Sequence, residues 1–252
     1  KNKIMSEEIK SNEFEQILEK AKKDDRIVGL ILTGGRGKGM FTENSDYDIA
    51  IITTDESVSD VKEEYKGKQD IVDIGVLPIS GFRIYAAVGT AEDWDRYTYA
   101  HIKARIDKTG EIQKIIDEKG ILPKDQISKV AKNALGGYLN SLYRSVKNVR
   151  DGNTFASHFD ACESLPWLLT FLFADEGRVR PYNKFLKWEL EKYPLKNLPI
   201  SSEDFLGKIE SVIKSGDIEI QKEFHKIAEE IAVKNDCSDV IDDWEGYYFA
   251  RE

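Results

Sequence analysis

The sequence predicts an α+β protein, in which an N-terminal domain with a mixed β-sheet is followed by a C-terminal α-helical bundle. Short β-branched runs alternate with helical segments up to about residue 120. From about residue 125, apolar residues recur at three- and four-residue steps, and few residues alternate with a period of two. The chain has 252 residues, 40% of them hydrophobic, so two domains, 1–120 and 121–252, can each bury a core.

In the N-terminal half, we expect β-branched and leucine-rich runs to form strands and the segments between them to form helices. The expected strands are 26–34, 47–53, 69–78, 82–88 and 101–107, and the expected helices are 6–24, 55–67 and 91–99. Residues 107–112, "DKTGEI", are expected to form a turn in which Gly110 supplies a positive φ.

The C-terminal half is expected to consist of helices joined by short turns. Its expected helices cover about 125–150, 154–175, 181–192, 201–215 and 217–235. A net charge of −9 argues against a broad basic surface for nucleic acid, and two distant cysteines argue against a disulfide framework. No apolar run approaches the ~20 residues of a membrane span. We therefore expect a soluble cytoplasmic protein without nucleic-acid or membrane partners.

The stretch with the most chemical information is "LILTGGRGKGMFTENSDYDIAIIT", residues 30–53. Its glycine-rich turn is not a Walker A loop, because Lys38 is followed by Gly39 and Leu32 occupies the position of the first glycine. It is not a dinucleotide-binding turn either, since Gly35, Gly37 and Gly39 are spaced by two and two residues. A third kind of phosphate-binding loop remains.

Two aspartates, Asp46 and Asp48, open the strand that follows the glycine-rich turn. Residues two apart on a strand point to the same face, and two neighbouring carboxylates repel unless a cation lies between them. Oxygen ligands favour Mg²⁺ or Mn²⁺. A phosphate-binding loop beside such a pair indicates chemistry on a nucleoside triphosphate (NTP) with two Mg²⁺ ions.

The segment "GGRGKGMFTENSDYD" resembles the signature of the DNA polymerase beta-like nucleotidyltransferase superfamily, a Gly-Ser turn followed by Ser-Asp-x-Asp. In layout it is most similar to the bacterial aminoglycoside and lincosamide nucleotidyltransferases, which add a helical bundle. The resemblance implies a triphosphate on the loop 33–39 and metal ligands at the two aspartates. Gly35 stands where the family has serine, so one hydroxyl contact is lost. The implied nucleotide-binding residues here are Thr33, Gly34, Gly35, Arg36, Lys38 and Ser45.

A third carboxylate is expected on the strand 69–78, where Asp70 and Asp73 both qualify. They are three residues apart and face opposite sides of a regular strand, so only one can join the pair. The family's third aspartate is usually followed directly by apolar residues. The resemblance therefore favours Asp73 as the third catalytic and metal-binding residue.

Two segments of the helical half are candidates for substrate contacts. Glu163 lies between apolar residues in sequence, where a carboxylate can serve as a general base; Asp160 is second. Antibiotic-modifying relatives commonly use a helical-domain glutamate to deprotonate the acceptor. Further on, "RVRPYNK" presents Tyr182, Asn183 and Lys184 from a constrained turn, and the resemblance implies that they contact the nucleotide.

The sequence therefore predicts a Mg²⁺-dependent nucleotidyltransferase that transfers AMP from ATP, or another NTP, to a hydroxyl of a small molecule such as an aminoglycoside-like antibiotic. One alternative is a protein-modifying, antitoxin-like enzyme. Another is a catalytically weak nucleotide-binding module, for which Gly35 is the argument. The acceptor, the preferred base and the oligomeric state do not follow from the sequence.

Overall fold

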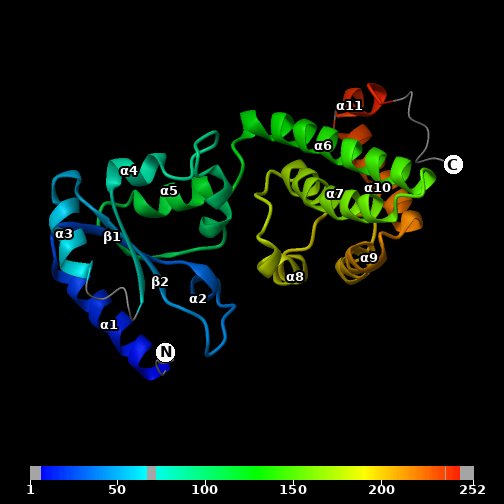
Figure 1. Cartoon of the computed structure of the whole chain (residues 1–252). Helices are drawn as coiled ribbons and strands as arrows, with labels where there is room; N and C mark the ends of the chain where they lie inside the picture. Colours follow the sequence, from blue (N-terminus) through cyan, green and yellow to red (C-terminus); the bar gives the residue numbers. More distant parts are fainter. Residues whose placement is uncertain (1–6, 67–71, 236, 245–252) are drawn as a thin grey trace. The chain divides into compact units, whose positions relative to one another are not determined.

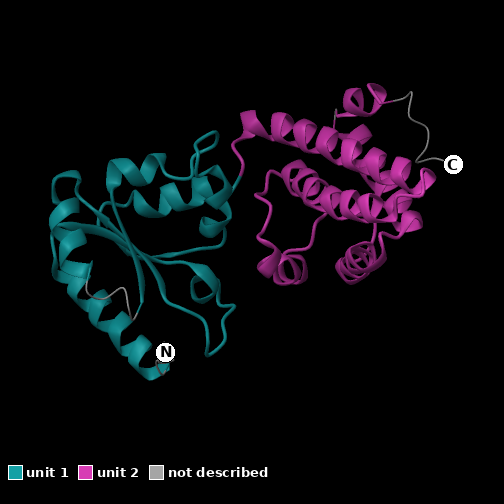
Figure 2. Ribbon diagram, in the orientation of Figure 1, with its two compact units in different colours: residues 1–121 teal, residues 122–252 magenta. Residues whose placement is uncertain are grey.

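The computed structural model describes residues 7–66, 72–235 and 237–244. The chain divides into two compact units, residues 1–121 and 122–252 (Figure 2). Unit 1 has an apolar core on each face of its sheet, and unit 2 has one core shared by its helices. Each unit is described by itself below.

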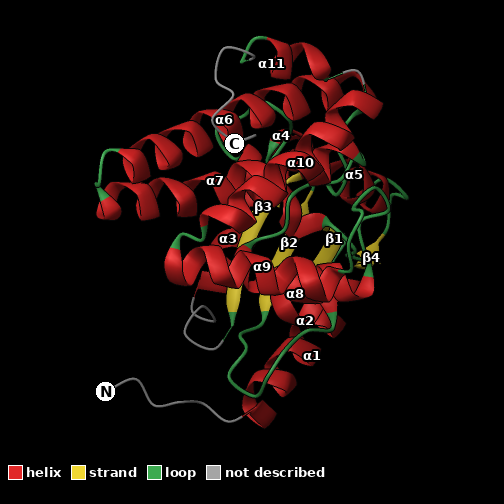
Figure 3. Ribbon diagram, turned by 90° about the vertical axis from the view of Figure 1, so that its right-hand side faces the viewer, coloured by secondary structure: helices red, strands yellow, loops and turns green. Residues whose placement is uncertain are grey.

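Unit 1 is built on a four-stranded mixed sheet with the order β3-β2-β1-β4 (Figures 1 and 3). Strand β1 pairs antiparallel with β2 and β4, whereas β2 and β3 run parallel. The strands are β1 (Ile27–Leu32), β2 (Asp48–Thr53), β3 (Asp73–Pro78) and β4 (Ala104–Asp107). The predicted α+β fold class with a mixed sheet is confirmed.

Helices cover both faces of this sheet (Figure 1). On one face lie α1 (Glu7–Lys23) and α3 (Val58–Tyr65), which bury Phe14, Ile17 and Val61. On the other lie α4 (Ile79–Ile84) and α5 (Ile112–Lys119). The short segments are α2 (Gly34–Lys38), η1 (Asp55–Ser57) and η3 (Asp93–Tyr99). The expected turn at 107–112 is present, and Gly110 has φ +73°.

The prediction of a strand at 82–88 is wrong. The segment forms the end of α4 and a turn, and its burial explains why: Phe82 and Ala86 are fully buried, whereas Ile84 between them is 65% exposed. Residues on one face of a strand would be buried together. Helix α5 was not predicted, and the expected helix 91–99 is a 3₁₀ helix.

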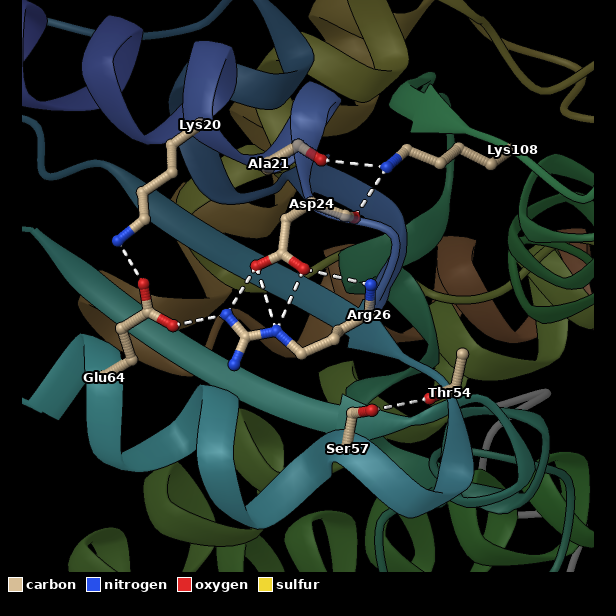
Figure 4. Close-up of polar contacts among 8 residues, drawn as sticks. All are labelled: Lys20, Ala21, Asp24, Arg26, Thr54, Ser57, Glu64 and Lys108. Carbon is tan, nitrogen blue, oxygen red and sulfur yellow. Dashed lines mark hydrogen bonds and ion pairs between the residues drawn. The ribbon is translucent and has the colours of Figure 1, made fainter.

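A polar network fastens the turn between α1 and β1 (Figure 4). The Arg26 guanidinium donates to Asp24 and Glu64, both at 2.6 Å, and thereby ties the turn to α3. Lys20 on α1 also pairs with Glu64, and the Lys108 ammonium donates to the main-chain carbonyl of Asp24 at 2.7 Å. The network holds α1, α3 and the end of β4 at one edge of the sheet.

Unit 2 is helical, as predicted. Its elements are α6 (Lys124–Arg150), α7 (Thr154–Asp175), α8 (Asn183–Lys192), α9 (Ser202–Ser215), α10 (Ile218–Lys234) and α11 (Ser238–Asp242). Asn153, Ser201 and Asp217 accept hydrogen bonds from first-turn N–H groups of α7, α9 and α10, which satisfies donors that a helix start leaves unpaired. In the described part of the chain, no helix is long and apolar enough to cross a membrane.

Candidate active site

Asp48 and Asp73 are direct neighbours on the sheet. They are register partners at the first residues of the parallel strands β2 and β3. Their sequence neighbours Tyr47, Ile49 and Ile74 are buried in the core with α1 and α3, so strand alternation directs both carboxylates to the opposite face. Asp70 lies outside the described residues.

The start of α2 lies against Asp48. Thr33 forms the N-cap, and both its main-chain N–H and its hydroxyl donate to the Asp48 carbonyl, at 2.8 and 3.2 Å. Gly34 has φ +60°, and a Cβ at this position would lie 1.9 Å from Asp48 Oδ2. Only glycine leaves room for this carboxylate. The expected glycine-rich loop is therefore a short helix whose first residue contacts the aspartate.

The start of α2, which lies against Asp48, carries main-chain N–H groups that can donate hydrogen bonds. Gly37 is the first residue whose N–H bonds back to the Thr33 carbonyl, at 2.9 Å, so the N–H groups of residues 34–36 have no acceptor within the helix. The Thr33 side chain does not cap them. Gly35 is buried and its carbonyl accepts from Met40 N–H at 2.8 Å, which shapes the turn without a serine hydroxyl.

Asp46 was expected to open the strand with Asp48, but β2 begins at Asp48, and Asp46 lies in the turn before it with a partner on α1. Its side chain is 72% exposed and forms an ion pair with Lys10 of α1 at 2.8 Å. Among the described residues, no group of three or more aspartate, glutamate, histidine or cysteine side chains is gathered closely enough to hold a metal ion. The paired oxygen donors of Asp48 and Asp73 suit Mg²⁺, whereas Oδ1 of Asp46 is engaged by Lys10.

Arg36 is held inside unit 1. Its side chain is 4% exposed, pairs with Glu7 and donates to the Ser45 carbonyl at 3.0 Å. The guanidinium also lies 4.0 Å from the Tyr47 ring centroid. As placed, Arg36 therefore connects α1, α2 and the turn before β2. Ser45 closes that turn by accepting from Thr42 N–H at 2.9 Å through its hydroxyl.

Lys38 is also buried, on the opposite side of α2. Its ammonium donates to the main-chain carbonyls of Tyr97 at 2.9 Å and of Ala100 and lies over the Tyr97 ring. This arrangement fastens α2 to η3. The sequence suggested that Arg36 and Lys38 lie beside a triphosphate, but in the structure both cations make internal contacts.

Glu163 is exposed on α7. Ala161 and Leu165, two residues before and two residues after it, are buried. Because a helix turns by about 100° per residue, these two side chains lie on a different face of α7 from Glu163. The apolar setting expected for this carboxylate is therefore not formed. Asp160 is half-buried and accepts from Asn148 of α6 at 2.8 Å.

Tyr182, Asn183 and Lys184 gather at the start of α8. Tyr182 is its N-cap residue and is half-buried, while the other two are exposed. Asn183 Oδ1 accepts from Arg180 at 2.6 Å, and the Lys184 ammonium lies 5.3 Å from the Phe185 ring centroid. These residues belong to unit 2, as does Glu163.

The sequence reasoning missed the residues that hold the predicted ones. Glu7 and Lys10 both lie on α1. Glu7 pairs with Arg36, 29 residues further along the chain, and Lys10 pairs with Asp46, 36 residues further along. Their i, i+3 spacing shows that they share a helix face. No local pattern in the sequence, however, tells which residue that face meets.

Two aspartates are thus in register on a mixed sheet, and one of them lies against the short helix formed by the glycine-rich stretch. Residues 14–122 match the model of the family described as "Nucleotidyltransferase domain". This range includes all four strands and the residues from Thr33 to Asp73. The predicted enzyme class is thus confirmed: the protein is a nucleotidyltransferase. Such enzymes generally use an NTP and divalent metal ions.

Two further comparisons complete these findings. Among solved structures, the chain is similar to a nucleotidyltransferase-like protein from Exiguobacterium sibiricum 255-15. The identity is 11%, the TM-score is 0.40, and the match covers 89% of this chain and 77% of that chain. A comparison with curated proteins finds no match.

Proposed function

We propose that the protein is a Mg²⁺-dependent adenylyltransferase, which transfers AMP from ATP to a hydroxyl group of a small molecule and releases pyrophosphate. The observation that carries this proposal is that Asp48 and Asp73 are register partners on β2 and β3, and that Asp48 lies against Gly34 at the start of α2. A carboxylate pair beside unpaired backbone N–H groups offers both a cation site and a phosphate site.

The candidate site residues of unit 1 have separate roles in this proposal. The N–H groups of Gly34, Gly35 and Arg36 donate to phosphate oxygens. Asp48 and Asp73 would hold Mg²⁺, and Asp46, which pairs with Lys10, would be the third ligand. Bound Mg²⁺ would neutralise charge on the triphosphate and on the departing pyrophosphate. Arg36 and Lys38 contribute by fixing α2 rather than by direct contact.

Residues of unit 2 are proposed to serve the acceptor and the nucleotide. Glu163 is exposed, and the structure records no hydrogen bond or ion pair for it among the described residues, so its carboxylate can accept a proton from an acceptor hydroxyl. The acceptor oxygen forms a bond to the α-phosphorus as the bond to the β-phosphate oxygen breaks. Tyr182, Asn183 and Lys184 are proposed nucleotide contacts.

The acceptor is tested by label transfer. The protein is incubated with Mg²⁺, α-labelled ATP and a panel of aminoglycosides, lincosamides and candidate proteins. We expect the label on a small hydroxyl-bearing molecule, for which the net charge of −9 favours a cationic one. Label on a protein instead would support protein modification. NTP binding without transfer to any of these acceptors would contradict the proposal.

Asp48→Asn tests the metal assignment. The substitution keeps the shape of the side chain but removes the charge that holds Mg²⁺. We expect Mg²⁺-dependent ATP binding to be lost and label transfer to fall at least ~100-fold, which corresponds to roughly 3 kcal/mol of transition-state stabilisation. Asp60→Asn, at an exposed position of α3, is the matched control and should retain full activity. Unchanged turnover in Asp48→Asn would refute the assignment.

A further inference from the structure

The first turns of α1 contact the turn that carries Asp46. The Lys10 ammonium donates to Asp46 Oδ1 at 2.8 Å, and one turn earlier Glu7 accepts from the Tyr47 hydroxyl at 3.2 Å. One turn later, the Phe14 ring packs against the Tyr47 ring, with the ring centroids 5.3 Å apart. Successive turns of one face of α1 therefore hold the two residues that directly precede β2.

The two partners of the Lys10–Asp46 ion pair differ in exposure. The Lys10 side chain is 14% exposed, whereas the Asp46 side chain is 72% exposed. Among the residues that the structure describes, Asp46 is the only recorded hydrogen-bonding or ionic partner of Lys10. Because most of the Lys10 side chain is covered, its charge has a fixed position beside a carboxylate that remains open to solvent. Lys10 also precedes residues 14–122, the part of the chain that matches the family.

A fixed ammonium in this place has opposite effects on the two ions that the active site would take. It repels a Mg²⁺ ion on the same carboxylate, and at about 6 Å in a medium as polar as water this repulsion lowers the affinity roughly 10-fold. The ion pair need not break, because Lys10 contacts Oδ1 of Asp46 and a metal ion can bind Oδ2. The same charge attracts a triphosphate on α2, which lies beside this part of α1 because Arg36 pairs with Glu7.

We propose that Lys10 makes the active site select the complex of Mg²⁺ with a nucleotide over the free metal ion. Held by Asp46, the ammonium weakens the binding of Mg²⁺ alone and strengthens the binding of triphosphate, so the ion enters together with the NTP. The inference rests on the proposed function, in which Asp46, Asp48 and Asp73 hold the metal ion. Lys10 is then a specificity-determining residue that acts from a helix outside the ligand set.

The test measures the affinity of the full chain for Mn²⁺, whose binding electron paramagnetic resonance follows directly, in the absence of nucleotide. Lys10→Met removes the ammonium, and we expect it to bind Mn²⁺ ~10-fold more tightly than the unsubstituted protein. Lys22→Met is the matched control: Lys22 lies on the same helix and pairs with Glu19 at 2.6 Å. It is about 18 Å further along α1, well beyond a Debye length of about 8 Å, so its loss should change Mn²⁺ affinity less than ~2-fold.

Metal-free ATP provides a second readout with the opposite sign. Calorimetric titration with a chelator present should show ATP binding ~3- to 10-fold more weakly to Lys10→Met. Lys10→Arg keeps the charge, so it should retain both affinities within ~3-fold. Addition of about 0.5 M KCl should reduce both effects of Lys10→Met, because salt screens exposed charges. A loss of local structure would instead weaken the binding of both ions, whatever the salt concentration.

Unchanged or weaker Mn²⁺ binding by Lys10→Met, or equal effects of Lys10→Met and Lys22→Met, would overturn the proposal. In the Asp46→Asn background, Lys10→Met should change Mn²⁺ affinity less than ~3-fold, and an undiminished effect there would show that Lys10 does not act beside Asp46. Asp48→Asn separates this inference from the proposed function. If Asp48→Asn leaves Mn²⁺ affinity unchanged, the metal assignment itself fails. If it abolishes Mn²⁺ binding while Lys10→Met has no effect, only the role of Lys10 is lost.

Discussion

At the scale of single residues, Gly34 determines how closely α2 approaches the catalytic strand. Its positive φ is unfavourable for other residues, and the space a Cβ would need is filled by Asp48. Gly39, at the other end of α2, also has a positive φ, of +73°, but a Cβ there would meet nothing within 4 Å. Substitutions at the two glycines therefore distinguish the cost of backbone strain, which both share, from the cost of a clash with the Asp48 carboxylate, which only Gly34 has.

Gly34→Ala should affect both stability and activity. Gly39→Ala carries only the cost of the left-handed backbone, about 1–2 kcal/mol. Gly34→Ala adds the displacement of Asp48, so we expect at least ~1 kcal/mol of further destabilisation and a label-transfer rate below a tenth of normal. Urea unfolding and label transfer measure the two effects. Equal losses in the two variants would show that contact with Asp48 is unimportant.

The residue scale also shows where sequence reasoning succeeds. Asp48 and Asp73 are register partners on β2 and β3, which is what strand alternation needs if their side chains are to share a face. Asp46 precedes β2 and pairs with Lys10 of α1, so strand alternation does not apply to it. The partners of Arg36, Lys38 and Asp46 could not be inferred. They come from α1 and η3, and which side chain meets them depends on how those elements pack.

At the scale of elements, the connection between α7 and α8 is fastened by one buried ion pair. Glu189 on α8 accepts from Arg178, and Glu176 at the end of α7 accepts from the main-chain N–H groups of Lys196 and Asn197. The Arg178–Glu189 pair thus spans the turn that contains Tyr182 to Lys184, and Glu176 holds the segment that follows α8. The conformation of the turn depends on acids that lie outside the "RVRPYNK" segment itself.

Glu189→Gln should therefore loosen this connection. The substitution leaves the Arg178 charge with a weaker partner in a largely buried position, and we expect the free energy of unfolding to fall by about 3 kcal/mol. Glu191→Gln is the control: Glu191 lies on the same helix, is 59% exposed and pairs with Lys187, so its loss should cost at most ~0.5 kcal/mol. Chemical denaturation compares the variants, and similar midpoints would contradict the proposed anchor.

The elements themselves were predicted well where they are long. Helices α1, α6, α9 and α10 have repeated apolar faces, so their periodicity is unambiguous. The error at 82–88 concerns a short segment of mixed composition, in which Phe82 and Ala86 fit either period until the burial of Ile84 is known. Tertiary packing decided that segment.

At the scale of the whole molecule, unit 1 encloses a buried lysine that should make its stability depend on pH. Lys119 is 3% exposed, and its ammonium donates to the main-chain carbonyls of Arg83 and Tyr85. Burial, aided by the nearby charge of Arg96, lowers the pKa of Lys119 from 10.5 to about 8. Between these values the unfolded chain binds more protons than the folded one.

The free energy of unfolding should accordingly rise from about pH 8 to pH 9.5. The expected slope from Lys119 is about 1 kcal/mol per pH unit. Above pH 10 the effect is opposed, because burial raises the pKa of Tyr65 and Tyr85 to about 12 and the unfolded chain loses their protons first. Lys119→Met removes the titrating group, so denaturation curves across this range should show a smaller slope. An equal slope would refute the assignment.

The sequence by itself determined the enzyme class and the mixed-sheet domain followed by helices. These follow from motif spacing and from periods of two and 3.6 residues, which are local. Tertiary structure alone decided that Arg36 and Lys38 are internal and that Asp46 pairs with Lys10. Each of these outcomes depends on side chains brought together from distant parts of the chain or on the burial that packing creates.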